Sequence, residues 1–365
     1  MTKLPSPLQS LKAWFARHAP QLRLAVRVAV AGIAAYVIGA AAHLPQVYWV
    51  TFSAVLVTQA SVGGSIKAAI DRFLGTAGGA AYGGVLGTLL PHAEVQHAVL
   101  LLAFTLIPTA FLAAIRPTFR LAPITALIVL FGTANTDLTP LQSAIDRVYE
   151  IAAGSLVGIG VSLVVLPARA HDLVGVAARD VLILLADLIA FVNAAFQQRP
   201  SPVDLDEVRA RLVTALAFVE TTSDEARRER RTYLSSEPDP SPIARTLQRL
   251  RYDIAIFGRA AQETFPELIR TRLGPHFAGV AETLTAFLMK LGDSLARRTA
   301  PPDLADVIKT LDLYAAEMAA LRDAEAIREQ PTEIAGSVFA LSFGLQQIRA
   351  DLIDLRNRAA ERARD

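Results

Sequence analysis

The chain has 365 residues, of which 53% are hydrophobic and 19% charged, with no cysteine and a mean hydropathy of +0.38. This composition excludes a disordered chain, a collagen and a disulfide scaffold. The formal net charge is only +2, and the basic excess lies in the more apolar half, so we expect no nucleic-acid partner.

The charges divide the chain into two parts that meet near Arg169. Residues 1–169 contain 11 Lys or Arg and 5 Asp or Glu, whereas residues 170–365 contain 25 and 29. Charged residues are costly at the centre of a bilayer. We therefore expect an all-α protein with a cytoplasmic lead at residues 1–20, a transmembrane domain at residues 21–168 and a cytoplasmic helical domain at residues 169–365.

Stretches without charged residues predict six membrane spans in the first part. About 20 helical residues cross a hydrocarbon core of about 30 Å. The stretches place the spans near residues 22–43, 46–62, 71–90, 95–115, 120–136 and 147–167. Lys and Arg gather in alternate loops, which the positive-inside rule assigns to the cytoplasm. Both termini are therefore expected in the cytoplasm, and the protein in a plasma membrane in contact with lipid.

A repeated tetrapeptide relates the third span to the sixth. Ala-Ile-Asp-Arg occurs at residues 69–72 and again at residues 144–147. The same offset aligns Gly79 with Gly154 and Gly83 with Gly158. Because each copy holds three spans, the second copy crosses the membrane in the opposite sense. The sequence therefore predicts a 3+3 inverted repeat, which in secondary transporters places the substrate site between the copies.

Glycines at every fourth position leave one side of the third span bare, and the sixth span repeats this pattern more weakly. Such a stripe favours close packing of helix backbones, or leaves room for a substrate path; both interpretations stay open. The glycines are Gly75, Gly79, Gly83 and Gly87 in the third span and Gly154 and Gly158 in the sixth.

Basic groups within or beside the spans are candidates for contacting an anion, because a charge in a bilayer is costly. Arg72 and Arg147 occupy equivalent positions of the repeat, and Arg27 lies in the first span. Lys67 follows residues 63–65, a Gly-Gly-Ser turn whose amides could attract an anion. Snorkelling of Arg27 to the headgroups and a plain positive-inside loop at Lys67 remain the alternatives.

Acidic groups in the same regions are candidates for coupling a proton to the substrate. Glu150 lies one helical turn beyond Arg147, and Asp71 and Asp146 open the two copies of the repeat. Helix capping is the alternative for Asp71.

Polar and aromatic side chains in the second, third and fifth spans would line the same central space if the copies face each other. Trp49 could stack on an aromatic substrate or belong to an aromatic belt. The candidates are Trp49, Thr51, Thr58, Gln59, Thr76, Thr133 and Asn135.

Signs of catalysis are missing from the sequence. The histidines His43, His92 and His97 do not have the spacing of metal ligands, and the chain has no nucleophile elbow and no P-loop. We expect no enzyme activity, no metal and no cofactor.

Prolines divide residues 170–365 into about six helices. Two of these helices carry apolar residues in alternating steps of four and three, which predicts the core of a bundle or, alternatively, a dimer contact. One seam is formed by Ile334, Val338, Leu341, Leu345, Ile348, Leu352 and Leu355. Four arginines surround Glu229, as expected of a solvated face or of contact with anionic lipid headgroups.

A run of residues in the second and third spans resembles the signature of the fusaric acid resistance protein family. The matching residues are Tyr48, Trp49, Thr51, Gln59, Gly63, Arg72, Gly75, Thr76, Gly79 and Gly83. That family includes the bacterial aromatic acid exporters and is similar to the plant aluminium-activated malate transporters. The resemblance covers about residues 20–168; in the second copy Glu150 and Ile151 replace Gly-Thr.

The resemblance implies efflux of small, often aromatic, organic anions across the bacterial inner membrane. It also implies a homodimer, because the chain has half the length of exporters that carry two such units, and a periplasmic adaptor protein as a partner. Our first hypothesis is a proton-coupled secondary exporter of aromatic carboxylic anions. The alternatives are a passive organic-anion channel and a membrane scaffold or sensor acting through its helical tail.

Overall fold

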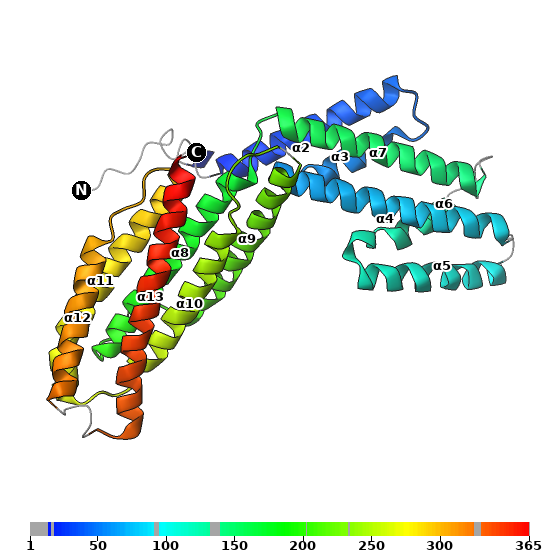
Figure 1. Ribbon diagram of the computed structural model, residues 1–365. Coiled ribbons are helices and arrows are strands. Elements are labelled where there is room, and N and C mark those ends of the chain that lie inside the picture. The colour runs from blue at the N-terminus through cyan, green and yellow to red at the C-terminus, as the bar shows by residue number, and fades with distance from the viewer. Residues whose placement is uncertain are drawn as a thin grey trace, which may run out of the picture. The chain divides into compact units, whose positions relative to one another are not determined.

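The computed structural model describes residues 14–15, 18–90, 95–131, 139–201, 203–232, 234–324 and 330–364. These residues form helices and no strand, which confirms the all-α prediction (Figure 1). The chain divides into two compact units, Met1–Arg169 and Ala170–Asp365. The division follows the residue at which the charge composition of the sequence changes.

Within the first unit, six α-helices pack in a symmetrical pattern. Helices α4 and α7 lie against each other, α3 packs on α7, α6 packs on α4, α2 covers α3 and α5 covers α6. Contacts of residue 65 with residue 162 and of residue 84 with residue 144 make α4 and α7 antiparallel. The helices are α2 (Ala19–Ala41), α3 (Val47–Val57), α4 (Val62–Leu89), α5 (Val95–Ile115), α6 (Ala122–Phe131) and α7 (Pro140–Val164), with a 3₁₀ turn η1 (Pro117–Phe119) before α6.

Two described helices, α2 and α7, are long and apolar enough to cross a membrane. The apolar helix α3 and the apolar stretches Val99–Ile115 and Pro117–Phe131 are shorter. The predicted second span at residues 46–62 is wrong in length, because its helix has 11 residues and ends at Val57, where the backbone of Thr58 turns extended. The count of six spans stays a prediction.

Two helices begin earlier than the charges in the sequence predicted. α4 starts at Val62 because the Ser61 hydroxyl accepts a hydrogen bond from Gly64 N at 2.8 Å. α7 starts at Pro140 behind a capping box formed by Thr139 and Gln142. The predicted starts at residues 71 and 147 were therefore too late, and Arg72 and Arg147 lie well inside their helices rather than at the ends.

Helix α2 buries small residues and exposes large apolar ones. Ala31, Ala35 and Gly39 face the other helices, whereas Ile33 is 67% exposed and Val37 is also exposed. A soluble helix would show the opposite pattern, because burying large apolar side chains is what stabilises it in water. An apolar outer face of this kind is expected of a helix that contacts lipid.

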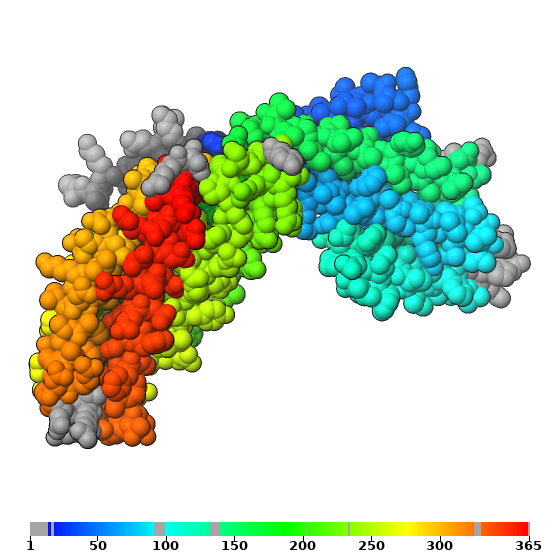
Figure 2. All heavy atoms as spheres, in the orientation of Figure 1, coloured from blue at the N-terminus to red at the C-terminus, as the bar shows by residue number. Residues whose placement is uncertain are grey.

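The second unit contains six described helices around one apolar core. They are α8 (Ala170–Phe196), α9 (Leu205–Arg231), α10 (Ser241–Ala261), α11 (Glu267–Arg297), α12 (Ala305–Asp323) and α13 (Thr332–Arg364). The predicted seam of α13 is buried in this core from Val338 to Leu355, and Ile334 is partly buried against it. The seam therefore belongs to the bundle core. Helices α12 and α13 lie side by side, as their orange and red surfaces in Figure 2 show.

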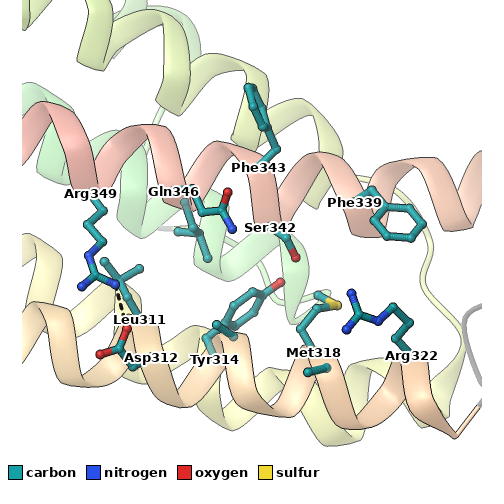
Figure 3. Close-up of a pocket in the computed structure, with 13 residues that line it drawn as sticks. Leu311, Asp312, Tyr314, Met318, Arg322, Phe339, Ser342, Phe343, Gln346 and Arg349 are labelled. Carbon is teal, nitrogen blue, oxygen red and sulfur yellow. Dashed lines mark hydrogen bonds and ion pairs between the residues drawn. The ribbon is translucent and has the colours of Figure 1, made fainter.

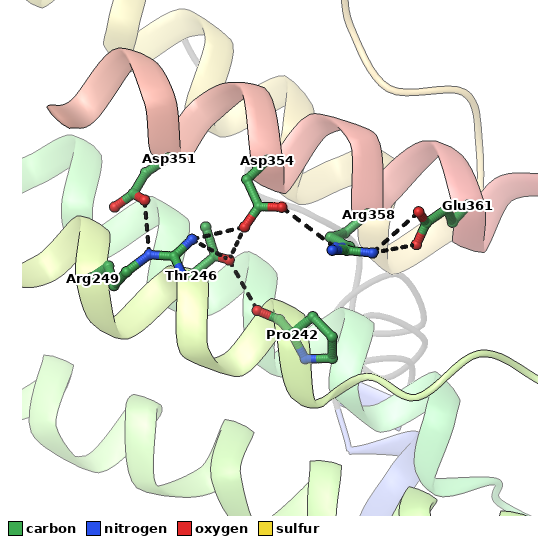
Figure 4. Close-up of polar contacts among 7 residues, drawn as sticks. All are labelled: Pro242, Thr246, Arg249, Asp351, Asp354, Arg358 and Glu361. Carbon is green, nitrogen blue, oxygen red and sulfur yellow. Dashed lines mark hydrogen bonds and ion pairs between the residues drawn. The ribbon is translucent and has the colours of Figure 1, made fainter. Parts of the chain in front are cut away.

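Ion pairs join α10 to α13 along the edge of this bundle. Arg249 donates to Asp351 at 2.9 Å and to Asp354 at 2.7 Å, and Asp354 also pairs with Arg358 (Figure 4). Of the four partners, Arg249, Asp354 and Arg358 are partly accessible and Asp351 is nearly buried. Each pair has at least one accessible partner, so we expect it to contribute at most about 1 kcal/mol.

Glu229 is buried, although the four arginines around it in the sequence suggested a solvated face. Both of its carboxylate oxygens accept a hydrogen bond from the backbone amide of Ala170, at 3.0 and 3.1 Å. A carboxylate at the amino terminus of a helix also interacts favourably with the helix dipole. Glu229 therefore holds the start of α8.

Candidate functional site

A buried polar cluster joins the start of α3 to the middle of α7. Arg147 and Glu150 are three residues apart and so share one face of α7; their side chains form an ion pair at 3.2 Å. Gln46 donates its backbone amide to Glu150 at 2.8 Å, and its side-chain oxygen accepts from Arg147 at 3.1 Å. Arg147 is only 5% exposed and Glu150 1%.

Trp49 contacts both Arg147 and Gln46 of this cluster. Its ring centroid lies 4.3 Å from the guanidinium carbon of Arg147, and its indole nitrogen donates to the Gln46 side-chain oxygen at 3.0 Å. The Tyr48 hydroxyl donates to the same oxygen at 2.7 Å. Trp49 therefore has a cation–π contact with a candidate anion-binding group, which the aromatic-belt interpretation did not include.

The cluster can hold a carboxylate in contact with a guanidinium away from bulk water. Burying an ion pair is costly unless both partners are also hydrogen-bonded. Gln46 supplies one such hydrogen bond to each of Arg147 and Glu150, while Nε of Arg147 has no hydrogen-bond partner among the described residues. A second carboxylate that reached Arg147 would compete with Glu150 for the same donors.

Arg72, the repeat equivalent of Arg147, reaches the middle of α3 instead. Its Nε donates to the Ser53 hydroxyl at 3.0 Å, and its side chain is buried. No carboxylate among the described residues forms an ion pair with Arg72. Ser53 also lies against Gly154 of α7, so α3, α4 and α7 meet at this point.

Arg27 lies inside the first unit. It is almost fully buried, and its Nη2 donates to the carbonyl oxygen of Ala60 at 2.8 Å. Its Nε and Nη1 have no hydrogen-bond partner among the described residues. Both the anion-contact and the snorkelling interpretations of Arg27 therefore stay predictions.

The prediction of a flexible anion-attracting turn at residues 63–65 is wrong. These residues form the first turn of α4, and the amides of Gly64 and Ser65 donate to Ser61. Lys67 is exposed and pairs with Asp71 at 2.6 Å on the outer face of α4. Asp146 is partly exposed on α7. Roles for Lys67, Asp71 and Asp146 stay predictions.

Most of the predicted polar lining is satisfied by its own helix. The hydroxyls of Thr51 and Thr58 donate to Val47 O and Ala54 O, and the Gln59 amide donates to Leu56 O. Thr76 is buried in the middle of α4. Thr133 and Asn135 lie outside the described residues, and their roles also stay predictions.

The repeated glycines lie at equivalent close contacts. A Cβ on Gly154 would meet the Val50 carbonyl oxygen and lie 2.6 Å from Ser53 Cβ, and a Cβ on Gly79 would meet the Ala122 carbonyl oxygen and lie 2.9 Å from Thr125 Cβ. A Cβ on Gly158 or Gly83 would lie 2.9 Å from Ala54 O or 2.7 Å from Ala126 O. The glycines thus serve helix packing, also at Gly75 against Leu121 and at Gly87 against Pro140.

The sequence analysis missed Gln46 of this cluster and Ser53, the partner of Arg72. Gln46 was placed only at the start of the predicted second span, and Ser53 was not singled out. Neither could be found from spacing, because their partners lie 101 and 19 residues away along the chain.

Comparisons with known proteins place a family match within the first unit. Residues 30–161 match the family described as "Fusaric acid resistance protein-like", a family of membrane transporters. A curated relative from Escherichia coli (strain K12), named "Uncharacterized protein YhfK", is 25% identical over 203 residues, which is 55% of this chain. The match spans only 28% of that relative's length. Residues 30–161 are therefore fusaric acid resistance protein-like, which confirms for this segment the family resemblance recognised in the sequence.

Proposed function

We propose that the protein is a secondary transporter that exports small organic anions, with an aromatic carboxylate as the substrate class. The observation that carries this proposal is the buried cluster of Arg147, Glu150, Gln46 and Trp49. A guanidinium beside an indole ring suits a ligand with a carboxylate and an aromatic ring. The transporter-like family of residues 30–161 supports the same function.

The pairing of α3 with α7 and of α6 with α4 supports an inverted repeat. In such transporters the halves rock against each other around a central site. We propose a plasma-membrane location with six spans and both termini in the cytoplasm. A homodimer and a periplasmic adaptor are proposed from the resemblance to longer exporters alone.

The ion pair gives the proposed transport cycle a defined dependence on pH. Ionised Glu150 accepts a hydrogen bond from Nη1 of Arg147 at 3.2 Å, so a substrate carboxylate competes with it for this donor. Protonating Glu150 removes this competition, and by thermodynamic linkage the proton and the anion favour each other's binding. In the proposed cycle the proton stays on Glu150 while the anion leaves, so one negative charge crosses the membrane. The inside-negative membrane potential drives that charge outward by about 2.3 kcal/mol for each 100 mV.

Flux of labelled 4-hydroxybenzoate from proteoliposomes tests this proposal. The full chain is reconstituted with a potential imposed by a potassium gradient and equal pH on both sides. We expect flux to rise as the pH is lowered, and to lose its pH dependence in Glu150→Gln, whose amide cannot ionise. Arg147→Gln should lose most of the flux, whereas Arg120→Gln, which changes an exposed arginine, should match the natural protein.

Counterflow separates the proposed carrier from a passive channel. Excess unlabelled substrate on one side accelerates uptake of the label through a carrier but not through a channel. Full flux in correctly folded Arg147→Gln would contradict the assignment of the site. No flux for any of several anions would instead favour a scaffold or sensor.

A further inference from the structure

A pocket lies between α12 and α13 in the second unit, far along the sequence from the transport cluster. Its volume is about 450 Å³, within the range of small-molecule sites. Figure 3 shows Tyr314 pointing from α12 toward Ser342 of α13, with Arg322 and Arg349 at opposite ends. Phe339 also lines it.

Two hydroxyl groups in this pocket have no partner. Tyr314 is only 2% exposed, and neither its hydroxyl nor the buried hydroxyl of Ser342 makes a hydrogen bond within the described residues. Burial raises the pKa of the Tyr314 phenol, so it stays protonated and able to donate. A buried polar group without a partner costs free energy, commonly about 1–3 kcal/mol. A ligand that accepts hydrogen bonds would recover that free energy.

The charged groups at the ends of the pocket favour an anion. Arg349 forms an ion pair with Asp312 at 2.7 Å, whereas the one ion-pair contact of Arg322 among the described residues is a long one, 3.8 Å to its neighbour Asp323. The guanidinium groups and the two hydroxyls are all donors. Asp312 is already paired with Arg349, so a carboxylate ligand meets donors rather than a free negative charge.

The apolar part of the pocket favours an aromatic body on that anion. Phe339 and Phe343 are four residues apart on α13, so they share a face, and both are more than half exposed. Both rings therefore lie outside the shared apolar core of the bundle and are accessible to a ligand. Ring-to-ring contacts prefer offset or edge-on geometry, which two neighbouring phenylalanines can offer to a flat ligand.

We propose that this pocket binds a small aromatic carboxylate, with the acid group at Arg322 and the hydroxyls of Tyr314 and Ser342, and the ring against Phe339 and Phe343. The site belongs to the second unit, and its ligand is held without any contribution from the transport cluster. It would let the helical region respond to the concentration of an aromatic acid on its own side of the membrane.

Cysteine protection in the full-length protein tests the pocket locally, because the natural chain has no cysteine. Ala319→Cys places a thiol in the pocket lining of α12, and Ala316→Cys places the control thiol at an exposed position of the same helix outside the lining. Gln346→Cys provides a second pocket thiol on α13 should the first variant fold poorly. The rate of alkylation by a maleimide is measured with and without 4-hydroxybenzoate.

We expect 4-hydroxybenzoate at ten times its dissociation constant to slow alkylation of the pocket thiol about tenfold, and to leave the control thiol unchanged. Tyr314→Phe or Arg322→Gln in the same background should weaken binding about three- to tenfold. The neutral 4-hydroxybenzamide should protect far less. Flux measured on the same variants stays normal if only the pocket is affected.

Four results would overturn the proposal. They are the absence of protection at both pocket thiols, equal protection of the control thiol, equal protection by the amide, and equal protection by octanoate, which has the acid group without the ring. Loss of flux through Arg147→Gln with pocket protection intact would separate the two sites, and pocket failure with normal flux would leave the transport proposal standing.

Discussion

Adding one methyl group at Gly154 should separate α7 from α3. The new Cβ would meet the carbonyl oxygen of Val50 and lie 2.6 Å from Ser53 Cβ, closer than carbon atoms pack. Backbone cannot move aside as a flexible side chain can, so the two helices must shift. Overpacking of this kind costs about 1–3 kcal/mol.

Gly160 of the same helix is the matched control, since a Cβ there meets no atom within 4 Å. Alanine also gains about 1 kcal/mol over glycine in a helix. That gain is common to Gly154→Ala and Gly160→Ala, so the difference between the variants isolates the packing cost. For a unit of about this size, 1 kcal/mol corresponds to about 2–4 °C, so Gly154→Ala should melt about 2–12 °C below Gly160→Ala.

Thermal unfolding in detergent, followed by tryptophan fluorescence in a Trp14→Phe background so that Trp49 on α3 alone reports, measures this difference. Gly79→Ala should show a loss of similar size, because its Cβ would meet the equivalent carbonyl oxygen on α6. Equal melting temperatures for Gly154→Ala and Gly160→Ala would refute the packing argument. A neutral Gly79→Ala beside a damaging Gly154→Ala would refute the equivalence of the two helix pairs.

Three further predictions concern the second unit. Burial, and to a lesser extent the neighbouring Asp351 carboxyl, raise the pKa of Asp253 from 3.8 to about 6, so the free energy of unfolding falls as the pH rises between these values. In urea unfolding, Asp253→Asn should therefore stabilise the protein by about 1 kcal/mol or less at pH 8 and give no gain at pH 3.5. Asp206→Asn, which changes an exposed carboxylate, is the control. Phe277→Ala should cost about 3–5 kcal/mol because it removes the ring stacked between two others, whereas half-exposed Phe218→Ala should cost far less by the same unfolding measurement. Glu229→Ala should increase hydrogen exchange at the first turn of α8, and unchanged exchange would contradict its role as a cap.

Helix type and packing faces were predictable from the sequence, but helix starts and side-chain partners were not. The glycine stripe and the α13 seam repeat at fixed intervals, and periodicity of this kind directly indicates the buried face. The start of α4 was misplaced because Lys67 and Asp71 were treated as a boundary. They are instead an exposed pair on the surface of a continuing helix.

Partners distant in the chain set the limit on predicting the site. Glu150 and Arg147 could be proposed together because they are one turn apart. Their shared dependence on Gln46 follows only from the packing of α3 on α7. Spacing in the sequence carries no signal for such a contact. Arg147, Glu150 and Trp49 could therefore be named as candidates from the sequence, but Gln46 could not.

The two halves of the first unit share their packing but differ in chemistry at one position. Glu150 occupies in α7 the place that Gly75 occupies in α4. A Cβ on Gly75 would lie 3.2 Å from the carbonyl oxygen of Thr118, so a longer side chain has no room there. Gly154 contacts Val50 and Gly79 contacts Ala122, and the same register makes Gln46 the counterpart of Thr118. The backbone amide of Gln46 donates to the Glu150 carboxylate, whereas the Thr118 carbonyl lies against Gly75. Among the described residues of this unit, Glu150 is the only buried carboxylate, so it lies in one of the two matching halves. Because a longer side chain has no room at Gly75, Gly75→Glu should disrupt folding, and unchanged thermal unfolding in detergent would contradict this expectation.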